Sequence, residues 1–226
     1  MESKKIIQVV REYFDAKKKD VKSKYDWTIN FANLPDCVKL QTNTSLFEQN
    51  IELKKALTKQ FKKVKDNKTE VLKLIRYYIS YWGGIHTNSE STLKSYADSD
   101  VDEIIGKGTK GIASWSKALT VFNYEKYAIF DARVSASLNG LIYQETSIHG
   151  SFFPILISRN NTIKGFNMKL RNVTNRSSFK PTDTFYREYI KLLTEVANKS
   201  KVSIAEIEMS LFAYAEDIAN ETFKLK

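Results

Sequence analysis

Apolar residues recur every three to four positions along most of the chain, and this spacing predicts helices with one buried face. In residues 3–18, for example, Ile6, Val10 and Phe14 fall on one side. The same pattern predicts helices over residues 45–66, 69–82, 112–122, 131–142, 184–199 and 203–220, with two short helices between residues 88 and 105. We therefore expect a mainly α protein with little β structure.

Capping residues mark the ends of several expected helices. Gly83-Gly84 stops the helix over residues 69–82. Ser89 or Ser91 starts the first short helix, and Ser99, followed by acidic residues, starts the second. Asp131 is a good N-cap for the helix that follows it.

Two stretches lack a helical pattern. Residues 25–43 are interrupted by Pro35, and residues 144–183 are polar and basic. Each could hold a short strand, the second at "FFPILI". No linker is long enough to demand independent domains, so residues 1–226 are expected to form a single domain.

Composition narrows the function classes. Only 8 Gly and 3 Pro occur, which disfavours a turn-rich β sandwich, and no apolar run is long enough for a membrane span. The N-terminus lacks the apolar region of a signal peptide, and Cys37 is the only cysteine, so we expect a cytoplasmic protein. With one Cys and two His no zinc set can be built, and no cofactor is expected, although carboxylates alone could hold a divalent cation.

The formal net charge is +10, from 36 basic and 26 acidic residues. Such an excess favours a polyanionic partner, most often nucleic acid. Lysines scattered over a solvated surface explain it equally well, so charge alone decides nothing.

The segment over residues 99–142 orders its features as helix, glycine-containing hairpin, helix, short apolar link, and an aspartate at the next helix start. This order resembles the helix-hairpin-helix DNA glycosylases. "GIASWSKAL" is similar to their alkylation-repair hairpin, and "AIFDARVSASL" to their aspartate segment. The hairpin positions would be filled by Gly111, Ile112, Ala113, Trp115 and Ser116. A rival register puts "GKGTK", residues 106–110, on the hairpin, but places charged Lys107 where an apolar residue normally packs.

"WGGI" after a helix and the late "IEMSLFAYA" extend the resemblance to bacterial proteins with the fold of oxoguanine or alkylbase glycosylases, over roughly residues 75–215. Some such proteins act in defence against phages whose DNA carries modified bases. The resemblance implies a helix-hairpin-helix glycosylase-like fold, with the hairpin and catalytic segment at about 99–142 and closing helices at about 184–220.

For Asp131 the resemblance implies catalysis. Breaking an N-glycosidic bond builds positive charge on the deoxyribose, which an ionised carboxylate stabilises, and the same carboxylate can orient or deprotonate a water. The alternative is that Asp131 only caps its helix.

The hairpin is expected to bind DNA phosphate through backbone N–H groups and nearby lysines. The expected DNA-binding residues are Lys110, Gly111, Ile112, Ala113, Ser114, Trp115, Ser116, Lys117 and Arg133. Arg133 could instead pair with a carboxylate, and the hairpin could be an ordinary solvated loop. Relatives with lyase activity carry a Schiff-base lysine where Trp115 stands here, which implies a monofunctional enzyme; Lys117 or, in the rival register, Lys110 could supply that amine.

A flipped base needs a pocket of aromatic and polar groups. The candidates by residue type are Trp27, Trp82, His86, Tyr124 and Phe130, each of which could equally be structural. Further DNA contacts could come from the polar region, through Lys164, Lys169, Arg171 and Arg176.

The function expected from these features is a monofunctional DNA glycosylase that acts as a monomer on double-stranded DNA. Its substrate would be a damaged or modified base, with a modified phage cytosine as a candidate. A non-catalytic helix-hairpin-helix module of a larger complex is the alternative. A metal-dependent nuclease is weaker, because Asp100, Asp102 and Glu103 lie close together without a partner set.

Overall fold

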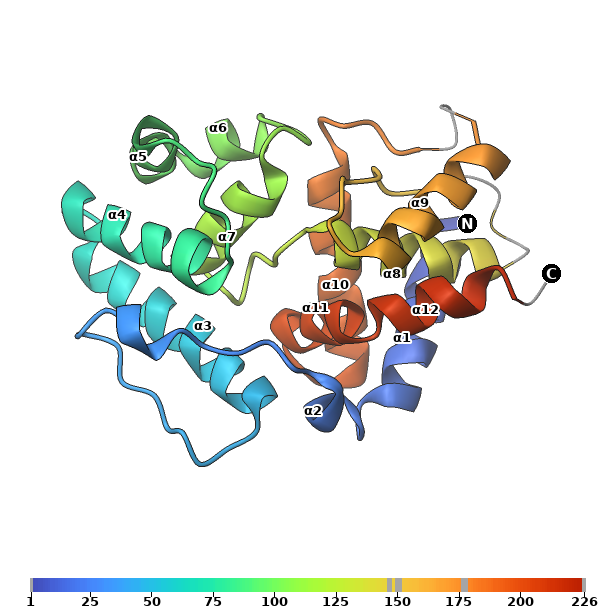
Figure 1. Cartoon of the computed structure of the whole chain (residues 1–226), viewed down its shortest axis with the longest axis horizontal. Coiled ribbons are helices and arrows are strands. Elements are labelled where there is room, and N and C mark those ends of the chain that lie inside the picture. The colour runs from blue at the N-terminus through green and yellow to red at the C-terminus, as the bar shows by residue number, and fades with distance from the viewer. Residues whose placement is uncertain (1, 146–147, 149–151, 176–178, 225–226) are drawn as a thin grey trace. The chain divides into compact units, whose positions relative to one another are not determined.

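A computed structural model of the chain describes residues 2–145, 148, 152–175 and 179–224, and these are mainly helical (Figure 1). The α-helices are α1 (Glu2–Lys17), α2 (Val21–Lys24), α3 (Leu46–Val64), α4 (Lys68–Arg76), α5 (Glu90–Asp98), α6 (Val101–Ile105), α7 (Ile112–Phe122), α8 (Ala132–Gln144), α9 (Asn161–Val173), α10 (Phe185–Ser200), α11 (Ile204–Ala213) and α12 (Ala215–Thr222). A 3-10 helix, η1 (Phe31–Asn33), and a π-helix, η2 (Tyr77–Trp82), complete them. Among the described residues, β pairing is limited to one bridge between Phe152 and Phe179, so the expectation of a mainly α fold is confirmed.

The chain divides into two compact units. The terminal unit contains Met1–Tyr25 and Phe130–Lys226, and the central unit contains Asp26–Ile129. Each unit has its own helices and its own buried residues. The single domain expected from the sequence stays a prediction.

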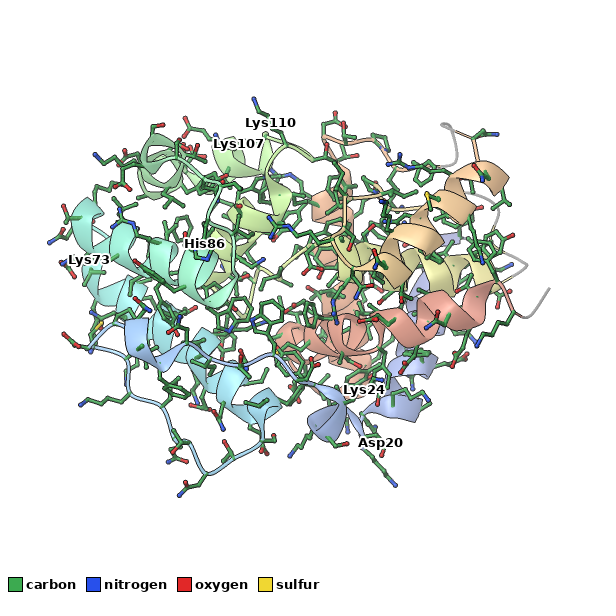
Figure 2. All side chains as sticks on the ribbon, in the orientation of Figure 1. Asp20, Lys24, Lys73, His86, Lys107 and Lys110 are labelled. Atoms are coloured by element: carbon green, nitrogen blue, oxygen red, sulfur yellow. The ribbon has the colours of Figure 1, made fainter. Side chains whose placement is uncertain are left out.

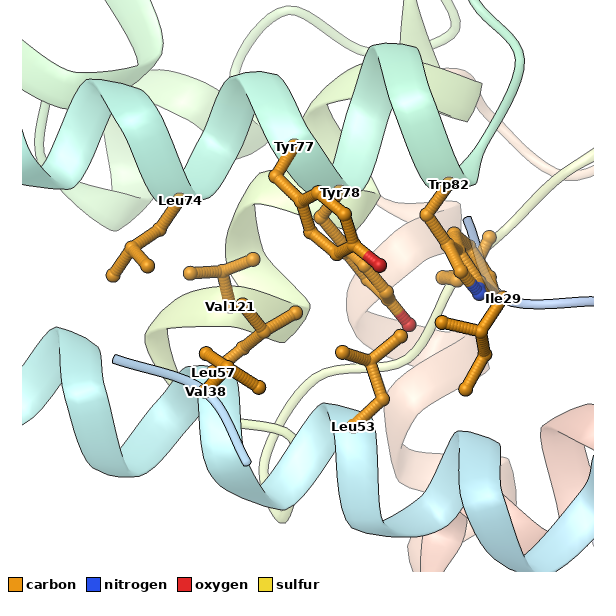
Figure 3. Close-up of a cluster of buried hydrophobic side chains, with 10 residues drawn as sticks. Ile29, Val38, Leu53, Leu57, Leu74, Tyr77, Tyr78, Trp82 and Val121 are labelled. Carbon is orange, nitrogen blue, oxygen red and sulfur yellow. The ribbon is translucent and has the colours of Figure 1, made fainter. Parts of the chain in front are cut away.

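The central unit is built on the long helix α3, which packs against α7 and α4. Figure 3 shows its core, in which α3 contributes Leu53 and Leu57, opposite side chains of α4 and η2. Within it Trp82 stacks on Tyr78 with ring centroids 4.3 Å apart and donates its indole N–H to Asn50 Oδ1 at 2.7 Å. The π-helix therefore ends in a side chain that is fixed by both stacking and a hydrogen bond.

The terminal unit pairs α1 with α10 and α8 with α12. Helix α8 approaches α12 closely at Gly140, where an added Cβ would lie 2.5 Å from Ile218 Cγ2. The extended residues after Phe152 are tied to α8 by a buried amide: Asn139 donates to the Phe153 carbonyl at 2.9 Å and accepts from the Phe153 N–H at 2.7 Å. Ser135 Oγ also donates to the Pro154 carbonyl at 2.7 Å.

Most expected helices are found close to their predicted positions, including α1, α3, α7 and α10. Several details differ. The second short helix begins at Asp100, whose carboxylate accepts from the Glu103 N–H in a capping box, while Ser99 ends α5. The expected single helix over residues 203–220 breaks at Tyr214 into α11 and α12.

Another difference is larger, because residues 144–183 were expected to be irregular and yet contain α9. Asn160 caps this helix by accepting from the Ile163 N–H at 3.0 Å. Its inward residues Ile163, Phe166 and Leu170 are spaced three and four apart, a short pattern that the surrounding polar residues obscure. The strand expected at "FFPILI" is also wrong, since it is reduced to the single bridge at Phe152.

Candidate functional site

A turn over residues 106–111 joins α6 to α7 and gives the hairpin its shape. Gly108 and Gly111 have φ values of 58° and 69°, a left-handed conformation that disfavours any residue with a Cβ. The Trp115 indole N–H donates to the Gly108 carbonyl at 3.2 Å and so fastens the turn to α7. The helix–turn–helix order expected from the sequence is present in the central unit.

The exposed part of the hairpin is basic and carries available backbone donors. Lys107 and Lys110 project from the turn (Figure 2), and Gly111 is exposed beside them. In the described part of the chain, the N–H groups of Gly111 and Ala113 have no acceptor. Uncommitted amides at a helix N-terminus next to lysines form a favourable position for a phosphate.

The other predicted hairpin residues face inward. Ile112, Trp115 and Ser116 are buried, and Ser114 Oγ accepts from Asn88 Nδ2 at 2.8 Å. Ser116 Oγ donates to the Ile112 carbonyl. Their contact with DNA stays a prediction, and the structure gives their side chains internal partners.

Lys117 is a buried lysine, 5% exposed, on the same helix. Its Nζ donates to the Ala113 carbonyl at 2.8 Å. The alkyl part of the side chain lies against Gly83, where an added Cβ would meet Lys117 Cε at 2.7 Å. The first glycine of "WGGI" therefore leaves room for this lysine, in addition to ending η2.

Asp131 caps α8 in the terminal unit, as the sequence predicted. Its Oδ1 accepts from the N–H groups of Arg133 at 2.9 Å and Val134 at 3.0 Å. Among the described residues, no hydrogen bond or ion pair engages the second oxygen, Oδ2. The half-buried carboxylate thus holds its helix with one oxygen and keeps the other uncommitted.

Phe130, the residue before Asp131, lies in an aromatic cluster. Its ring centroid is 5.1 Å from those of Phe185 and Tyr189 and 6.1 Å from that of Phe153. All four rings are buried, so the residue that precedes the α8 cap is held in the core of the terminal unit.

A second carboxylate in this neighbourhood was missed by the sequence analysis. Glu208 on α11 is 3% exposed, and burial together with the negative charges of Glu208, Tyr186 and Asp131 raises the pKa of Tyr189 well above its ordinary value. Glu208 lies four residues after Ile204 and three before Leu211, so the helical periodicity places it on the buried face. An acidic residue on an otherwise apolar helix face was the sequence feature that could have indicated a buried carboxylate.

Arg133 pairs with a carboxylate, which is one of the two roles expected for it. Its guanidinium lies 3.0 Å from Glu216 Oε1 and 4.9 Å from the centre of the Phe212 ring. A phosphate contact by Arg133 stays a prediction, and it would have to compete with Glu216.

The predicted base-pocket residues are distributed over both units. In the central unit, Trp27 packs edge-on against Trp82 at 5.9 Å and donates to its carbonyl at 3.1 Å, so both indoles have structural partners. Tyr124 is half-buried, with its N–H donating to Thr58 Oγ1, and His86 is exposed. Phe130 belongs to the terminal unit. Their role in a base pocket stays a prediction.

Two properties of the described residues bear on other chemistries. No group of three His, Cys, Asp or Glu side chains among them is arranged to hold a metal ion. No helix in the described part of the chain has the length and apolar character that a membrane span requires. Of the basic residues expected to contact DNA, Lys164, Lys169 and Arg171 lie on α9, and Arg176 lies outside the described residues.

Comparison with protein families, with curated proteins and with solved structures finds no match for this chain. The resemblance to helix-hairpin-helix glycosylases therefore rests on the motifs quoted above.

Proposed function

We propose that this protein is a monofunctional DNA glycosylase that removes a damaged or modified base from double-stranded DNA and leaves an abasic site. Asp131 is its catalytic residue. The observation that carries the proposal is the state of this carboxylate, which caps α8 through Oδ1, while no hydrogen bond or ion pair with a described residue engages Oδ2.

The chemistry follows from the charge that develops when the N-glycosidic bond breaks. The electron pair leaves with the base, and the deoxyribose becomes cationic at C1′. An ionised Asp131 stabilises this cation, and its free oxygen can accept a proton from the water that adds to C1′. Asp131 stands at the positive end of the α8 helix dipole.

The hairpin supports the proposal from the central unit. The free N–H groups of Gly111 and Ala113, together with Lys107 and Lys110, suit a DNA phosphate and read no base. A net charge of +10 fits the same partner. Phosphate contacts of this kind position an enzyme on DNA and leave base selection to other residues.

Two residues of the same hairpin support an enzyme that does not cleave the strand. Trp115 occupies the position of the Schiff-base lysine in the preferred register, and Lys117 directs its Nζ to the Ala113 carbonyl. The proposed substrate class is a modified phage cytosine. The proposed role of the protein is defence against phages, and we propose that it acts in the cytoplasm as a monomer. These finer statements rest on the resemblance.

The test is abasic-site formation on a panel of unmodified and phage-modified DNAs, in EDTA, by the wild type and by Asp131→Asn. We expect abasic sites with the wild type alone, strand breaks only after alkali, and no borohydride-trapped adduct. Binding without any abasic site would indicate a DNA-binding module, and cleavage that depends on Mg²⁺ would indicate a nuclease. A trapped adduct that is lost in Lys117→Gln would replace the monofunctional assignment with a lyase.

A further inference from the structure

The longest stretch of one charge sign in the chain lies in the terminal unit. Residues 146–182 contain six Lys or Arg residues and no Asp or Glu, although the whole chain has 26 acidic residues. Four of these cations are on or just before α9: Arg159, Lys164, Lys169 and Arg171. None of the four forms an ion pair with a described residue.

The same region carries the most exposed apolar side chain among the described large hydrophobics. Ile157 is 97% exposed, and Met168 on α9 is 56% exposed. Together with Ile155 and Leu156 they line a shallow groove of about 210 Å³ between residues 155–158 and α9. Asn167 Nδ2 donates to the Leu156 carbonyl at 3.1 Å and holds the two walls together.

Cations stand at both ends of this groove. Lys164, Met168 and Arg171 are spaced four and three apart, so they share one face of α9. Seven residues of helix separate the two cations by about 10.5 Å along the axis. The DNA minor groove is about 6 Å wide, so cations at this spacing can face the backbones on its two sides while the apolar residues point between them.

The position of Ile157 in the chain connects it to the proposed catalytic residue within the terminal unit. Ser135, one helical turn after Asp131, donates to the Pro154 carbonyl at 2.7 Å. Ile157 follows Pro154 by three residues, which span at most about 10 Å. The exposed apolar side chain is therefore within the reach of a few nucleotides from Asp131.

We propose that residues 155–158 and α9 form a DNA-binding surface on which Ile157 inserts into the base stack while Lys164 and Arg171 contact the flanking phosphates. Apolar wedges flanked by cations are a known way of unstacking bases from the minor groove. Unstacking beside the target lowers the cost of moving a nucleotide out of the duplex. This inference rests on the proposal that DNA is the substrate, and it assigns a positioning residue for it.

The test uses a duplex with a central tetrahydrofuran abasic-site analogue and 2-aminopurine next to it, so that no base needs to be identified. We expect the wild type to raise 2-aminopurine fluorescence severalfold on saturation, because the base is unstacked. Ile157→Ala should lose most of this rise while its Kd changes by less than about threefold, since phosphate contacts supply most of the affinity. Val173→Ala is the matched control, because Val173 is an exposed apolar residue of α9 outside the groove lining.

The cations are tested through the salt dependence of binding. Lys164→Gln and Arg171→Gln should each reduce the slope of log K against log salt by about 0.9, as expected for one lost phosphate contact. Lys199→Gln, at an exposed lysine of α10, should leave the slope unchanged.

Unchanged fluorescence in Ile157→Ala, or unchanged slopes in both charge variants, would overturn the inference. So would dimerisation of the wild type that Ile157→Asp abolishes without an effect on DNA, because the groove would then be an interface between two copies. Binding and fluorescence are read without base excision. They can therefore succeed if no abasic site is ever formed, and they can fail if the glycosylase activity is real.

Discussion

Replacing Asp131 separates its structural role from its proposed chemical one. Oδ1 accepts two backbone N–H groups at 2.9 and 3.0 Å, and Asp131→Ala leaves both donors without that partner. Loss of an N-cap costs about 1–2 kcal/mol of unfolding free energy. Asp131→Asn keeps an acceptor oxygen in place and loses only the interaction of the charge with the helix dipole, about 0.3–1 kcal/mol.

These energies convert into melting temperatures that calorimetry resolves. In a chain of this size 1 kcal/mol corresponds to about 2–4 °C in Tm. We expect Asp131→Ala to lower Tm by roughly 2–8 °C and Asp131→Asn by roughly 1–4 °C. The Tm of the alanine variant should be below that of the asparagine variant. Asp131→Ser, which restores a capping oxygen, should match Asp131→Asn. Equal melting of the alanine and asparagine variants would refute the assignment of Oδ1 as the cap.

Two further predictions concern packing and ionisation. Gly140→Ala should destabilise the protein by about 1–3 kcal/mol because its Cβ would lie 2.5 Å from Ile218 Cγ2. Gly165→Ala in α9, where a Cβ would have no atom within 4 Å, should stabilise the protein by about 0.5–1 kcal/mol. Urea unfolding measures both changes in free energy, and changes of the same sign would contradict the geometry. Burial raises the pKa of Tyr77 to about 12, so the unfolded chain releases this proton near pH 10 while the folded chain keeps it, and stability should fall as pH rises from 10 to 12. Tyr77→Phe should reduce that loss and Tyr81→Phe, at a side chain 42% exposed, should not; an identical alkaline slope in Tyr77→Phe would show that another group causes it.

The helical pattern of the sequence predicted helices correctly where several apolar residues lie on one face and a capping residue precedes or follows them. Helix α7 occupies the expected residues 112–122, and Asp131 caps α8 as predicted. Both cases depend on interactions between residues that are close in the chain, and a single sequence shows all of these residues. Asp100 replaced Ser99 as a cap because both residue types cap well and only the backbone decides between neighbours.

Features that depend on tertiary partners were not predictable in the same way. The inward face of α9 has three well-spaced apolar residues in a polar stretch, and its segment is held through Asn167 and Leu156. Gly83 was expected to stop a helix, and its contact with the Lys117 side chain requires the fold. Burial of Glu208 was readable from periodicity, but its influence on Tyr189 required the structure.

The most direct test of Asp131 as the catalytic residue is the rate of abasic-site formation by Asp131→Asn, at protein and DNA concentrations where its binding equals that of the wild type. We expect a folded variant that melts within about 4 °C of the wild type, binds the same DNA and forms no abasic sites on a substrate that the wild type processes. Abasic sites formed by this variant at the wild-type rate would contradict a catalytic role, and Asp131 would then be only the cap of α8.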